Sequence, residues 1–283
     1  MIGRLVMVAT PIGNLADLSP RAIETLTAAD LVCCEDTRRT GRLLAHAGVE
    51  ATRLLRVDEH TEAAATVEVG RLLDQGRLVA VVTDAGTPAV SDPGERLVAA
   101  AVAGGHVVSV VPGPSAAVAA LVASGLPTGR FVFEGFLPRR GGERQQRLGE
   151  LVNERRTIIV YESPRRLEAT LAELARLLGP SRSGAIAREL TKLHEEVVRG
   201  PLGDLAEWAR TPVKGEVVIV IEGAGPVAVP TDDDLISAVR TAMASGASRR
   251  DASGDVAEMF GVGRRRVYEL ALADSGPRLD DGA

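Results

Sequence analysis

The fold is decided by residues 81–94, which read Val81-Val82-Thr83-Asp84-Ala85-Gly86-Thr87-Pro88-Ala89-Val90-Ser91-Asp92-Pro93-Gly94. The apolar run from Leu78 to Val82 predicts a buried strand of a parallel sheet. Asp92 and Pro93 predict the N-cap and the first residue of a helix. Open α/β sheets form their ligand sites in such loops, at the carboxyl ends of the strands. A plain strand-to-helix turn has the same local pattern, so the other loops of the chain have to decide between the two interpretations.

Strands and helices alternate on both sides of this stretch. Apolar runs predict strands at residues 5–9, 31–34, 54–57, 78–82 and 107–111, with helical segments between them. This alternation predicts an α/β fold with a parallel sheet and helices on both of its faces. The pattern changes after Pro127, where connections shorten and strands are predicted at 131–134, 157–161, 185–188, 194–198 and 217–222. Some of these strands are hairpin-like, so we expect the second sheet to be mixed.

The chain therefore divides into three predicted parts. We expect an N-terminal α/β domain over residues 1–112 and a C-terminal α/β domain over residues 113–225. A Gly- and Pro-rich linker follows, and residues 231–275 form a helical tail whose pattern is similar to a helix-turn-helix.

Composition limits the classes of function. The chain has 283 residues, 45% of them hydrophobic, which is enough for a sizeable core. A net charge of −5 and only 2% aromatic residues argue against a generally basic nucleic-acid binder that stacks bases. Arginines are nevertheless clustered, and their forked side chains suit phosphate. The phosphate candidates are Arg38, Arg39, Arg139, Arg140 and Arg144, with ordinary solvated surface as the alternative.

Several common site types are absent from the sequence. Cys33 and Cys34 are adjacent in an apolar run, which excludes a disulfide framework or a cysteine metal site and suits a reducing compartment. No glycine fingerprint, P-loop, zinc spacing or nucleophile elbow is present. No signal-peptide or membrane-span pattern is found either, so we expect a cytoplasmic protein without a metal.

The strand-end loops together carry a family resemblance. The motifs are Thr10-Pro11-Ile12-Gly13-Asn14-Leu15, Glu35-Asp36-Thr37-Arg38, Thr83-Asp84-Ala85-Gly86-Thr87-Pro88, Ser91-Asp92-Pro93-Gly94, Pro112-Gly113-Pro114-Ser115-Ala116, Gly135-Phe136-Leu137-Pro138, Tyr161-Glu162-Ser163-Pro164 and Arg188-Glu189-Leu190-Thr191-Lys192. In this order they resemble the ribosomal small-subunit RNA methyltransferase I family, cytidine 2′-O-methyltransferases of the tetrapyrrole methylase superfamily. Two positions depart from the expected pattern, because Thr61 follows Glu59-His60 where asparagine is common and Arg165 follows Ser163-Pro164 where histidine is common.

The resemblance implies two α/β domains with S-adenosylmethionine in the cleft between them, a homodimer, and as substrate a decoding-centre cytidine of 16S rRNA. It also implies cofactor-binding positions at Pro11, Asp84, Gly86, Thr87, Ser115, Ala116, Tyr161 and Leu190.

A ribose hydroxyl is a poor nucleophile at neutral pH, so methyl transfer to it benefits from a base or a nearby positive charge. We expect Glu189 or Glu35 to be the base and Lys192 to stabilise the developing alkoxide. Lys192 is one of only two lysines in the chain, although a surface lysine beside a paired glutamate would look the same. Two other functions stay open, a methylase of tetrapyrroles or other small molecules and a non-enzymatic regulator that binds nucleic acid through its tail.

Overall fold

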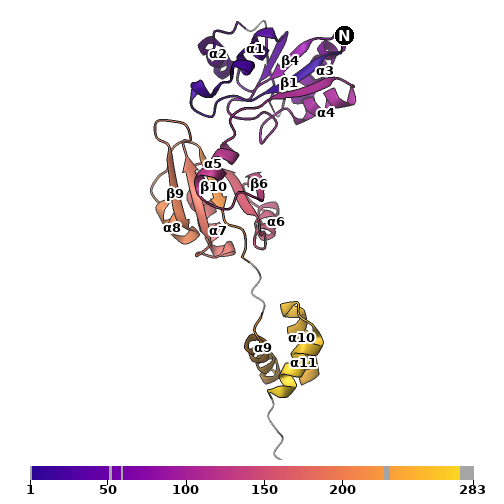
Figure 1. Ribbon diagram of the computed structural model, residues 1–283, viewed down its shortest axis with the longest axis vertical. Helices are drawn as coiled ribbons and strands as arrows, with labels where there is room; N and C mark the ends of the chain where they lie inside the picture. Colours follow the sequence, from indigo (N-terminus) through magenta and orange to yellow (C-terminus); the bar gives the residue numbers. More distant parts are fainter. Residues whose placement is uncertain (1, 51–52, 59, 226–229, 275–283) are drawn as a thin grey trace, which may run out of the picture. The chain divides into compact units, whose positions relative to one another are not determined.

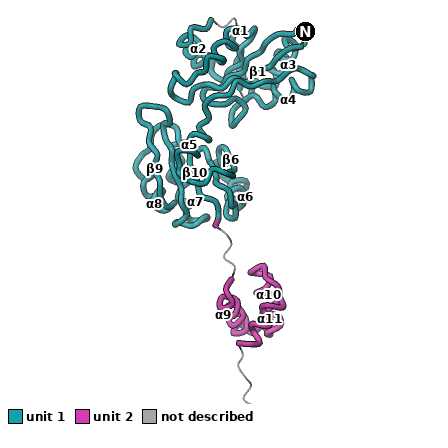
Figure 2. The backbone as a smooth tube through the Cα atoms, viewed as in Figure 1, with its two compact units in different colours: residues 1–224 teal, residues 225–283 magenta. Residues whose placement is uncertain are grey.

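The computed structural model describes all residues except 1, 51–52, 59, 226–229 and 275–283. The chain forms two compact units, residues 1–224 and residues 225–283 (Figure 2). The first unit contains two five-stranded sheets, and the second contains only helices among its described residues (Figure 1).

The first sheet is entirely parallel and has the strand order β3-β2-β4-β1-β5. Its strands are β1 (Arg4–Val8), β2 (Leu31–Cys34), β3 (Leu54–Arg56), β4 (Leu78–Val81) and β5 (Val107–Val111). The central strands are apolar on both sides because helices cover both faces. The predicted parallel sheet is therefore confirmed.

Two separate cores flank this sheet. One contains Leu26 and Leu44 from α1 (Pro20–Ala28) and α2 (Thr37–His46). The other contains Val69 and Leu97 from α3 (Glu62–Asp74) and α4 (Glu95–Ala103). A short 3-10 turn, η1 (Leu15–Asp17), precedes α1.

The second sheet is mixed, as predicted, with the order β6-β7-β10-β8-β9. Its strands are β6 (Phe131–Phe136), β7 (Thr157–Glu162), β8 (Ser183–Arg188), β9 (Glu196–Pro201) and β10 (Val217–Ile221). Only β6 and β7 pair in parallel, and the other neighbours are antiparallel. Its helices are α5 (Ala116–Ser124), α6 (Gly142–Leu151), α7 (Leu167–Leu178) and α8 (Leu202–Trp208). α5 packs against a core that includes Ile159 and Val218, whereas α7 and α8 share a core with Ile158 and Ile219.

The second unit is a small bundle of α9 (Asp232–Ala244), α10 (Arg249–Phe260) and α11 (Arg264–Ala273). Its core includes Leu235, Val256 and Val267, one residue from each helix. Thr231 and Asp234 form a capping box at the start of α9. Among the described residues, no helix is long and apolar enough to cross a membrane.

Two predicted helix starts are wrong. Asp92 and Pro93 do not begin α4, which starts at Glu95 with Gly94 as its N-cap. The reason is Glu62, a buried carboxylate that accepts hydrogen bonds from the backbone N–H groups of Gly94 (2.9 Å) and Arg96 (3.1 Å) and so replaces a side-chain cap.

The second wrong start is at Ser163-Pro164, where a serine followed by proline predicts the N-cap and first residue of a helix. These residues stay in the loop after β7, and α7 begins at Leu167. The backbone N–H of Ser163 donates to Glu162 (2.8 Å), and residues 164–166 form a separate turn in which the backbone N–H of Arg166 donates to the carbonyl of Ser163 (3.0 Å). Because α4 and α7 begin later than predicted, more residues of the two preceding loops can line a site.

Candidate functional site

The loops that follow two neighbouring strands of the parallel sheet are joined directly by hydrogen bonds. Thr10, after β1, and Gly86, after β4, exchange backbone hydrogen bonds of 2.9 and 3.1 Å. The Thr10 hydroxyl also donates to the carbonyl of Thr83 (3.1 Å). Gly86 has φ +88°, a conformation that favours glycine. The loop after β4 is thereby fixed against the loop after β1.

A cavity of about 410 Å³ lies beside this junction and is lined by both sheets' loops. That volume is within the usual range for a site that holds one small organic molecule. Five of the predicted cofactor positions that line it come from the parallel half or the start of α5: Asp84, Gly86, Thr87, Ser115 and Ala116. Tyr161 and Leu190 line it from the mixed half. The sequence motifs thus converge on one cavity.

Pro11 is the exception among the predicted cofactor positions. It is buried, and it lines a neighbouring hollow between the Thr10–Leu15 loop and α2 instead of the cavity itself.

The loop from Asp84 to Gly94 is held in an unusual conformation. Ala89 (φ +67°) and Ser91 (φ +61°) both adopt left-handed backbone angles although they are not glycine. Such residues cost on the order of 1–3 kcal/mol each and cluster at functional sites. The buried Glu62 at the start of α3 fixes the far end of the loop through its bonds to the start of α4.

Three carboxylates gather on one side of the cavity: Glu35 from the end of β2, and Asp84 and Asp92 from the loop. Arg39 of α2 forms an ion pair with Asp84 (3.2 Å), which balances one of the three charges. Burial and the neighbouring Asp84 raise the pKa of Glu35. The site is therefore acidic and suited to a cationic ligand.

Asp92 is the most perturbed of these acids. Burial raises its pKa to about 6, the nearby Thr83 hydroxyl offsets part of this, and Glu35 and Asp84 add to it. A carboxyl group in this pH range can exchange a proton near neutrality. The sequence pattern predicts a helix cap at Asp92, so this residue is not among the predicted site residues although it lies in the same motif.

The opposite wall of the cavity is aromatic. The ring of Tyr161 packs edge-on against Phe133 and Phe136, with centroids 4.9 and 5.6 Å away. Its hydroxyl accepts a hydrogen bond from the backbone N–H of Ala117 (3.2 Å), which fixes the start of α5. Burial raises the pKa of Tyr161, so the group is a neutral donor at physiological pH. Ser115 is the N-cap residue of α5, but its side chain makes no capping hydrogen bond.

Lys192 is held in an ion-pair cluster outside the cavity lining. Its ammonium group donates to Glu189 (2.7 Å) and to Glu216 (2.9 Å). Burial opposes its charge, but these two hydrogen bonds outweigh burial and raise its pKa. The hydrogen bond from Lys192 and another from the backbone N–H of Glu216 lower the pKa of Glu189. Lys192 is thus a fixed cation, and Glu189 is a weaker base than Glu35.

The loop that carries Lys192 is the second strained segment, since Glu189 (φ +50°) and Thr191 (φ +65°) are both left-handed. Thr191 accepts a hydrogen bond from the backbone N–H of Asn14 (3.1 Å), so this loop is tied to the loop after β1. Any side chain at Gly13 would collide with Lys192 and Thr191. The two halves of the first unit therefore meet at these loops.

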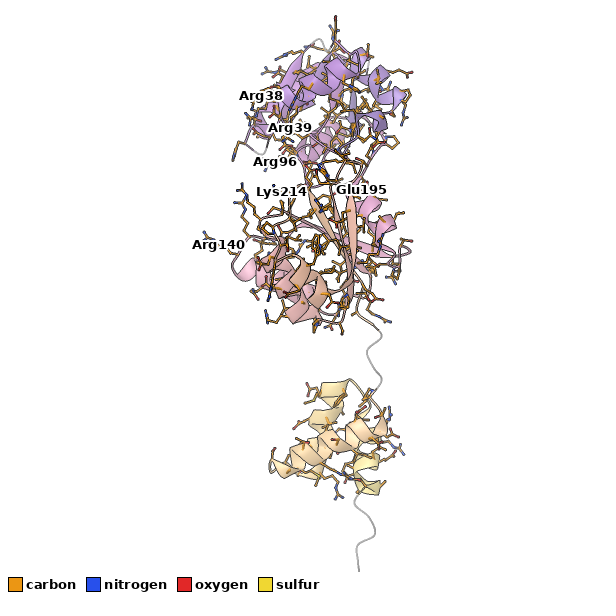
Figure 3. All side chains as sticks on the ribbon, turned by 90° about the vertical axis from the view of Figure 1, so that its left-hand side faces the viewer. Arg38, Arg39, Arg96, Arg140, Glu195 and Lys214 are labelled. Carbon is orange, nitrogen blue, oxygen red and sulfur yellow. The ribbon has the colours of Figure 1, made fainter. Side chains whose placement is uncertain are left out.

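The arginine candidates divide into two groups. Arg38, Arg39, Arg139 and Arg140 are exposed, and Figure 3 shows Arg38 and Arg39 on the half with the parallel sheet and Arg140 on the other half. Arg144 is only 7% exposed, which contradicts its predicted contact with RNA.

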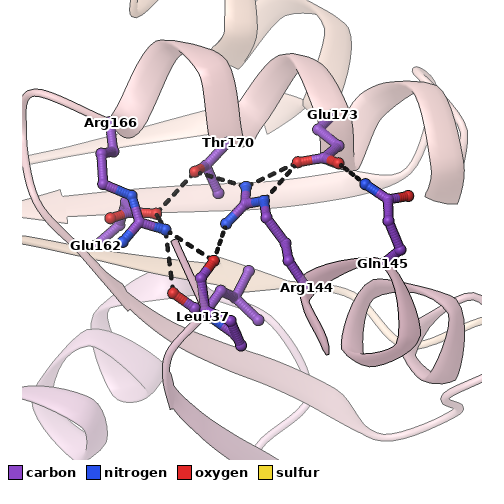
Figure 4. Close-up of polar contacts among 8 residues, drawn as sticks. Leu137, Arg144, Gln145, Glu162, Arg166, Thr170 and Glu173 are labelled. Carbon is purple, nitrogen blue, oxygen red and sulfur yellow. Dashed lines mark hydrogen bonds and ion pairs between the residues drawn. The ribbon is translucent and has the colours of Figure 1, made fainter. Parts of the chain in front are cut away.

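The guanidinium of Arg144 is occupied inside the protein (Figure 4). It donates to Glu173 (2.8 Å), to the hydroxyl of Thr170 (3.1 Å) and to the carbonyl of Pro138 (3.0 Å). Thr170 in turn donates to Glu162 (2.7 Å), a buried carboxylate at the cavity wall. Arg144 therefore supports the wall from behind, a role that the sequence does not distinguish from a surface arginine.

Comparison with known proteins identifies the fold and the family. Residues 4–206 match the family described as Tetrapyrrole (Corrin/Porphyrin) Methylases. The chain belongs to this family. The resemblance drawn from the loop motifs is thereby confirmed.

Curated relatives align over nearly the whole chain. The Ribosomal RNA small subunit methyltransferase I of Synechocystis sp. is 46% identical over 274 residues, covering 96% of this chain and 98% of the relative. The protein of the same name from Escherichia coli O157:H7 is 41% identical over 281 residues, covering 97% and 96%.

Solved structures of other tetrapyrrole methylases share the fold of this family member. The methyltransferase CobJ superposes with a TM-score of 0.61 at 20% identity, covering 79% of this chain and 95% of that one. Uroporphyrin-III C-methyltransferase from Thermus thermophilus, complexed with S-adenosyl homocysteine, superposes with a TM-score of 0.56 at 23% identity, covering 78% and 97%. At these identities the similarity shows the fold alone.

Other cavity-lining residues of this tetrapyrrole methylase were not predicted from the sequence. Phe136 and Glu216 belong to this group. Phe136 lies inside one of the motifs, whereas nothing near Glu216 in the sequence signals a site. Within the described part of the chain, no cluster of three or more His, Cys, Asp and Glu side chains could hold a metal ion.

The pKa of Asp92 makes a prediction about stability. A folded pKa of about 6, against 3.8 unfolded, means that stability falls as pH rises from about 4 through about 6, because ionisation costs more in the folded protein. Asp92→Asn removes that cost, so we expect it to stabilise the protein at pH 7.5 by on the order of 1 kcal/mol after solvent screening, but not at pH 4.5. Thermal unfolding at the two pH values measures the difference, with the exposed Asp17→Asn as control. The same shift for Asp92→Asn at both pH values would contradict the assignment.

Proposed function

We propose that the protein transfers a methyl group from S-adenosylmethionine to the ribose 2′-oxygen of a cytidine in the RNA of the small ribosomal subunit. The observation that carries the proposal is near-full-length identity of 41–46% to relatives named Ribosomal RNA small subunit methyltransferase I. The acidic cavity between the two sheets supports it independently. Such a substrate is found in the bacterial cytoplasm, where we expect the protein to act.

The cavity fits the proposed cofactor in charge and in shape. S-adenosylmethionine carries a cationic sulfonium and an ammonium group, and Glu35, Asp84 and Asp92 supply negative charge on one side. Leu190 and the aromatic ring of Tyr161 supply the apolar surface that suits an adenine ring. When bound, the cofactor provides the electrophilic methyl group. Gly86, Thr87, Ser115 and Ala116 offer backbone groups for the rest of the molecule.

The chain's own contribution to the reaction is to position the ribose hydroxyl and accept its proton. Glu35 is the better candidate base of the two that the sequence suggested, because it lines the cavity with a raised pKa. Glu189 is held by Lys192 and has a lowered pKa. Asp92 joins Glu35 as a candidate for the same reason. Lys192 remains the candidate for stabilising negative charge on the oxygen.

The exposed arginines are the candidate RNA contacts. Arg38 and Arg39 lie on α2 beside the cavity, and Arg139 and Arg140 lie on the loop after β6. Contacts of arginine and lysine with phosphate supply a large share of the affinity of nucleic-acid-binding proteins and make it depend on salt. Because the chain as a whole is negatively charged, its contacts with RNA are confined to local groups of arginines. Such local contacts suit a structured target, such as the assembled small subunit.

The function is tested by incubating the purified protein with S-adenosylmethionine and small ribosomal subunits from cells that lack the gene. We expect one 2′-O-methylcytidine per particle, detected by mass spectrometry of RNA digests. Naked 16S rRNA in parallel distinguishes the assembled particle from free RNA as substrate. Absence of methylation in both, or methylation only on a base, would refute the proposal.

The role of Lys192 has its own prediction. Removing a donor that stabilises a developing oxyanion costs roughly 10²–10³ in kcat. We therefore expect Lys192→Ala to lower kcat by about 10²-fold while the Kd for S-adenosylmethionine changes only a few-fold. Lys214→Ala, at the only other lysine, serves as control and should keep kcat near the parent value. Equal losses in kcat and cofactor affinity would show that Lys192 only supports the structure.

We also propose that the protein is a homodimer. β5 is an edge strand of its sheet, and Val107 (43% exposed) and Val110 (53%) are exposed on it. Val118 (49%) and Val122 (70%) lie one turn apart on α5, which follows β5 directly. Exposed apolar surface of this kind typically marks a protein interface, and a second copy of the chain is the occupant we propose.

The dimer is tested by placing charge on this surface. Val118→Glu with Val122→Glu should convert the protein to a monomer in analytical ultracentrifugation, because the two carboxylates would be buried without partners. Val67→Glu, on the exposed side of α3, is the matched control and should leave the oligomeric state unchanged. A monomeric parent protein, or a dimeric double variant, would contradict the proposal.

A further inference from the structure

Two further hollows lie next to the candidate cofactor cavity, and both are formed by α2. One, of about 360 Å³, lies between α2 and the loop after β1. The other is a shallow hollow of about 720 Å³ that is lined by α2 and its N-cap residue. We call the two together the α2 groove. Its charged residues are Asp36, Arg38, Arg39, Arg42 and Asp84.

Arg39 connects the α2 groove to the cavity. It lines the cavity and both hollows, and its ion pair with Asp84 (3.2 Å) stands at their common boundary. Arg42 lines both hollows and makes no ion pair with any described residue. The side chain of Arg38 is 90% exposed, and among the described residues its one ion pair is with the helix-capping Asp36, at 3.6 Å. The groove therefore presents unneutralised positive charge beside an acidic cavity.

Gly41 gives the groove its most informative feature. It lies in the interior of α2, where glycine costs up to about 1 kcal/mol relative to alanine. Its φ is not left-handed, and a side chain added there would meet nothing within 4 Å. Neither backbone conformation nor internal packing accounts for the residue. Open space over a helical glycine allows another chain to approach the helix backbone closely.

The spacing of these residues places them on one side of the helix. Arg38, Gly41 and Arg42 stand at positions i, i+3 and i+4, which are neighbours on a helix surface. Two cations therefore flank a gap without a side chain. A sugar–phosphate backbone fits this arrangement, because arginine binds phosphate through its fork and the ribose needs close approach.

We propose that the α2 groove seats the RNA backbone next to the target nucleotide, with the strand passing over Gly41 and its phosphates bound by Arg38 and Arg42. This inference rests on the proposed function. Arg39, between the groove and the cavity, then lies next to the nucleotide whose ribose enters the cavity. In this arrangement the RNA strand runs along α2 and the target nucleotide extends from it into the acidic cavity.

The test fills the gap without removing a charge. Gly41→Leu adds a side chain at a half-buried helix position that has open space above it, so it should raise or keep the unfolding midpoint and leave the Kd for S-adenosylmethionine unchanged. We expect it to weaken binding of small ribosomal subunits at least tenfold. Gly70→Leu is the matched control, because Gly70 is also a helical glycine with nothing within 4 Å, on α3. That variant should bind the particles like the parent.

Charge is tested separately by Arg38→Ala with Arg42→Ala. Each lost phosphate contact reduces the slope of log K against log salt by about 0.7–0.9, so the double variant should lose about 1.4–1.8. Arg71→Ala, an exposed arginine on α3, should leave the slope unchanged.

The outcomes separate the groove from the proposed function. Parent-like particle binding by Gly41→Leu, with an unchanged slope for the arginine double variant, would overturn the groove even if the parent methylates RNA. Failure of the parent to methylate, with particle binding that still depends on Gly41, would overturn the reaction and keep the groove. Absence of particle binding by the parent would overturn both.

Discussion

The pair of backbone hydrogen bonds between Thr10 and Gly86 is the constraint on which the site depends. The two hydrogen bonds join the segments that follow β1 and β4, which are neighbours in the sheet, beyond the last hydrogen bonds between the strands themselves. From this junction the chain runs in one direction to the loop that contacts Thr191, and in the other to the loop that carries Asp84. Without it, two loops of independent conformation would have to order themselves around each ligand, at an entropic cost to binding.

Charge is distributed around this junction by sign. Several carboxylates and one arginine line the cavity, whereas three arginines and two carboxylates line the α2 groove, and the ion pair of Arg39 and Asp84 stands between the two. The cavity is therefore acidic on balance and the groove basic on balance, so a cation and an anion can bind side by side. The same separation explains how a chain of net charge −5 can present a surface suited to RNA.

The sequence predicts what depends on short-range pattern and misses what depends on distant partners. Strand positions and the parallel pairing follow from apolar runs that alternate with helices, and seven of the eight predicted cofactor positions line the cavity. The start of α4 does not follow, because its cap is the carboxylate of Glu62, about 30 residues away in the sequence. Glu216 enters the cavity through the pairing of β10 with β7 and β8, which no local motif encodes.

Arginine clusters illustrate the same limit. Arg139, Arg140 and Arg144 stand within six residues of one another, yet only Arg144 lies on α6, where it reaches α7, whereas Arg139 and Arg140 lie in the loop before this helix. Its charge is balanced by Glu173, and its two terminal nitrogens donate to Thr170 and Pro138. A buried guanidinium with all its partners in place fixes the geometry of the wall that holds Glu162 and Tyr161. An exposed one, free of partners, can instead exchange water for phosphate, so burial and not clustering separates the two roles.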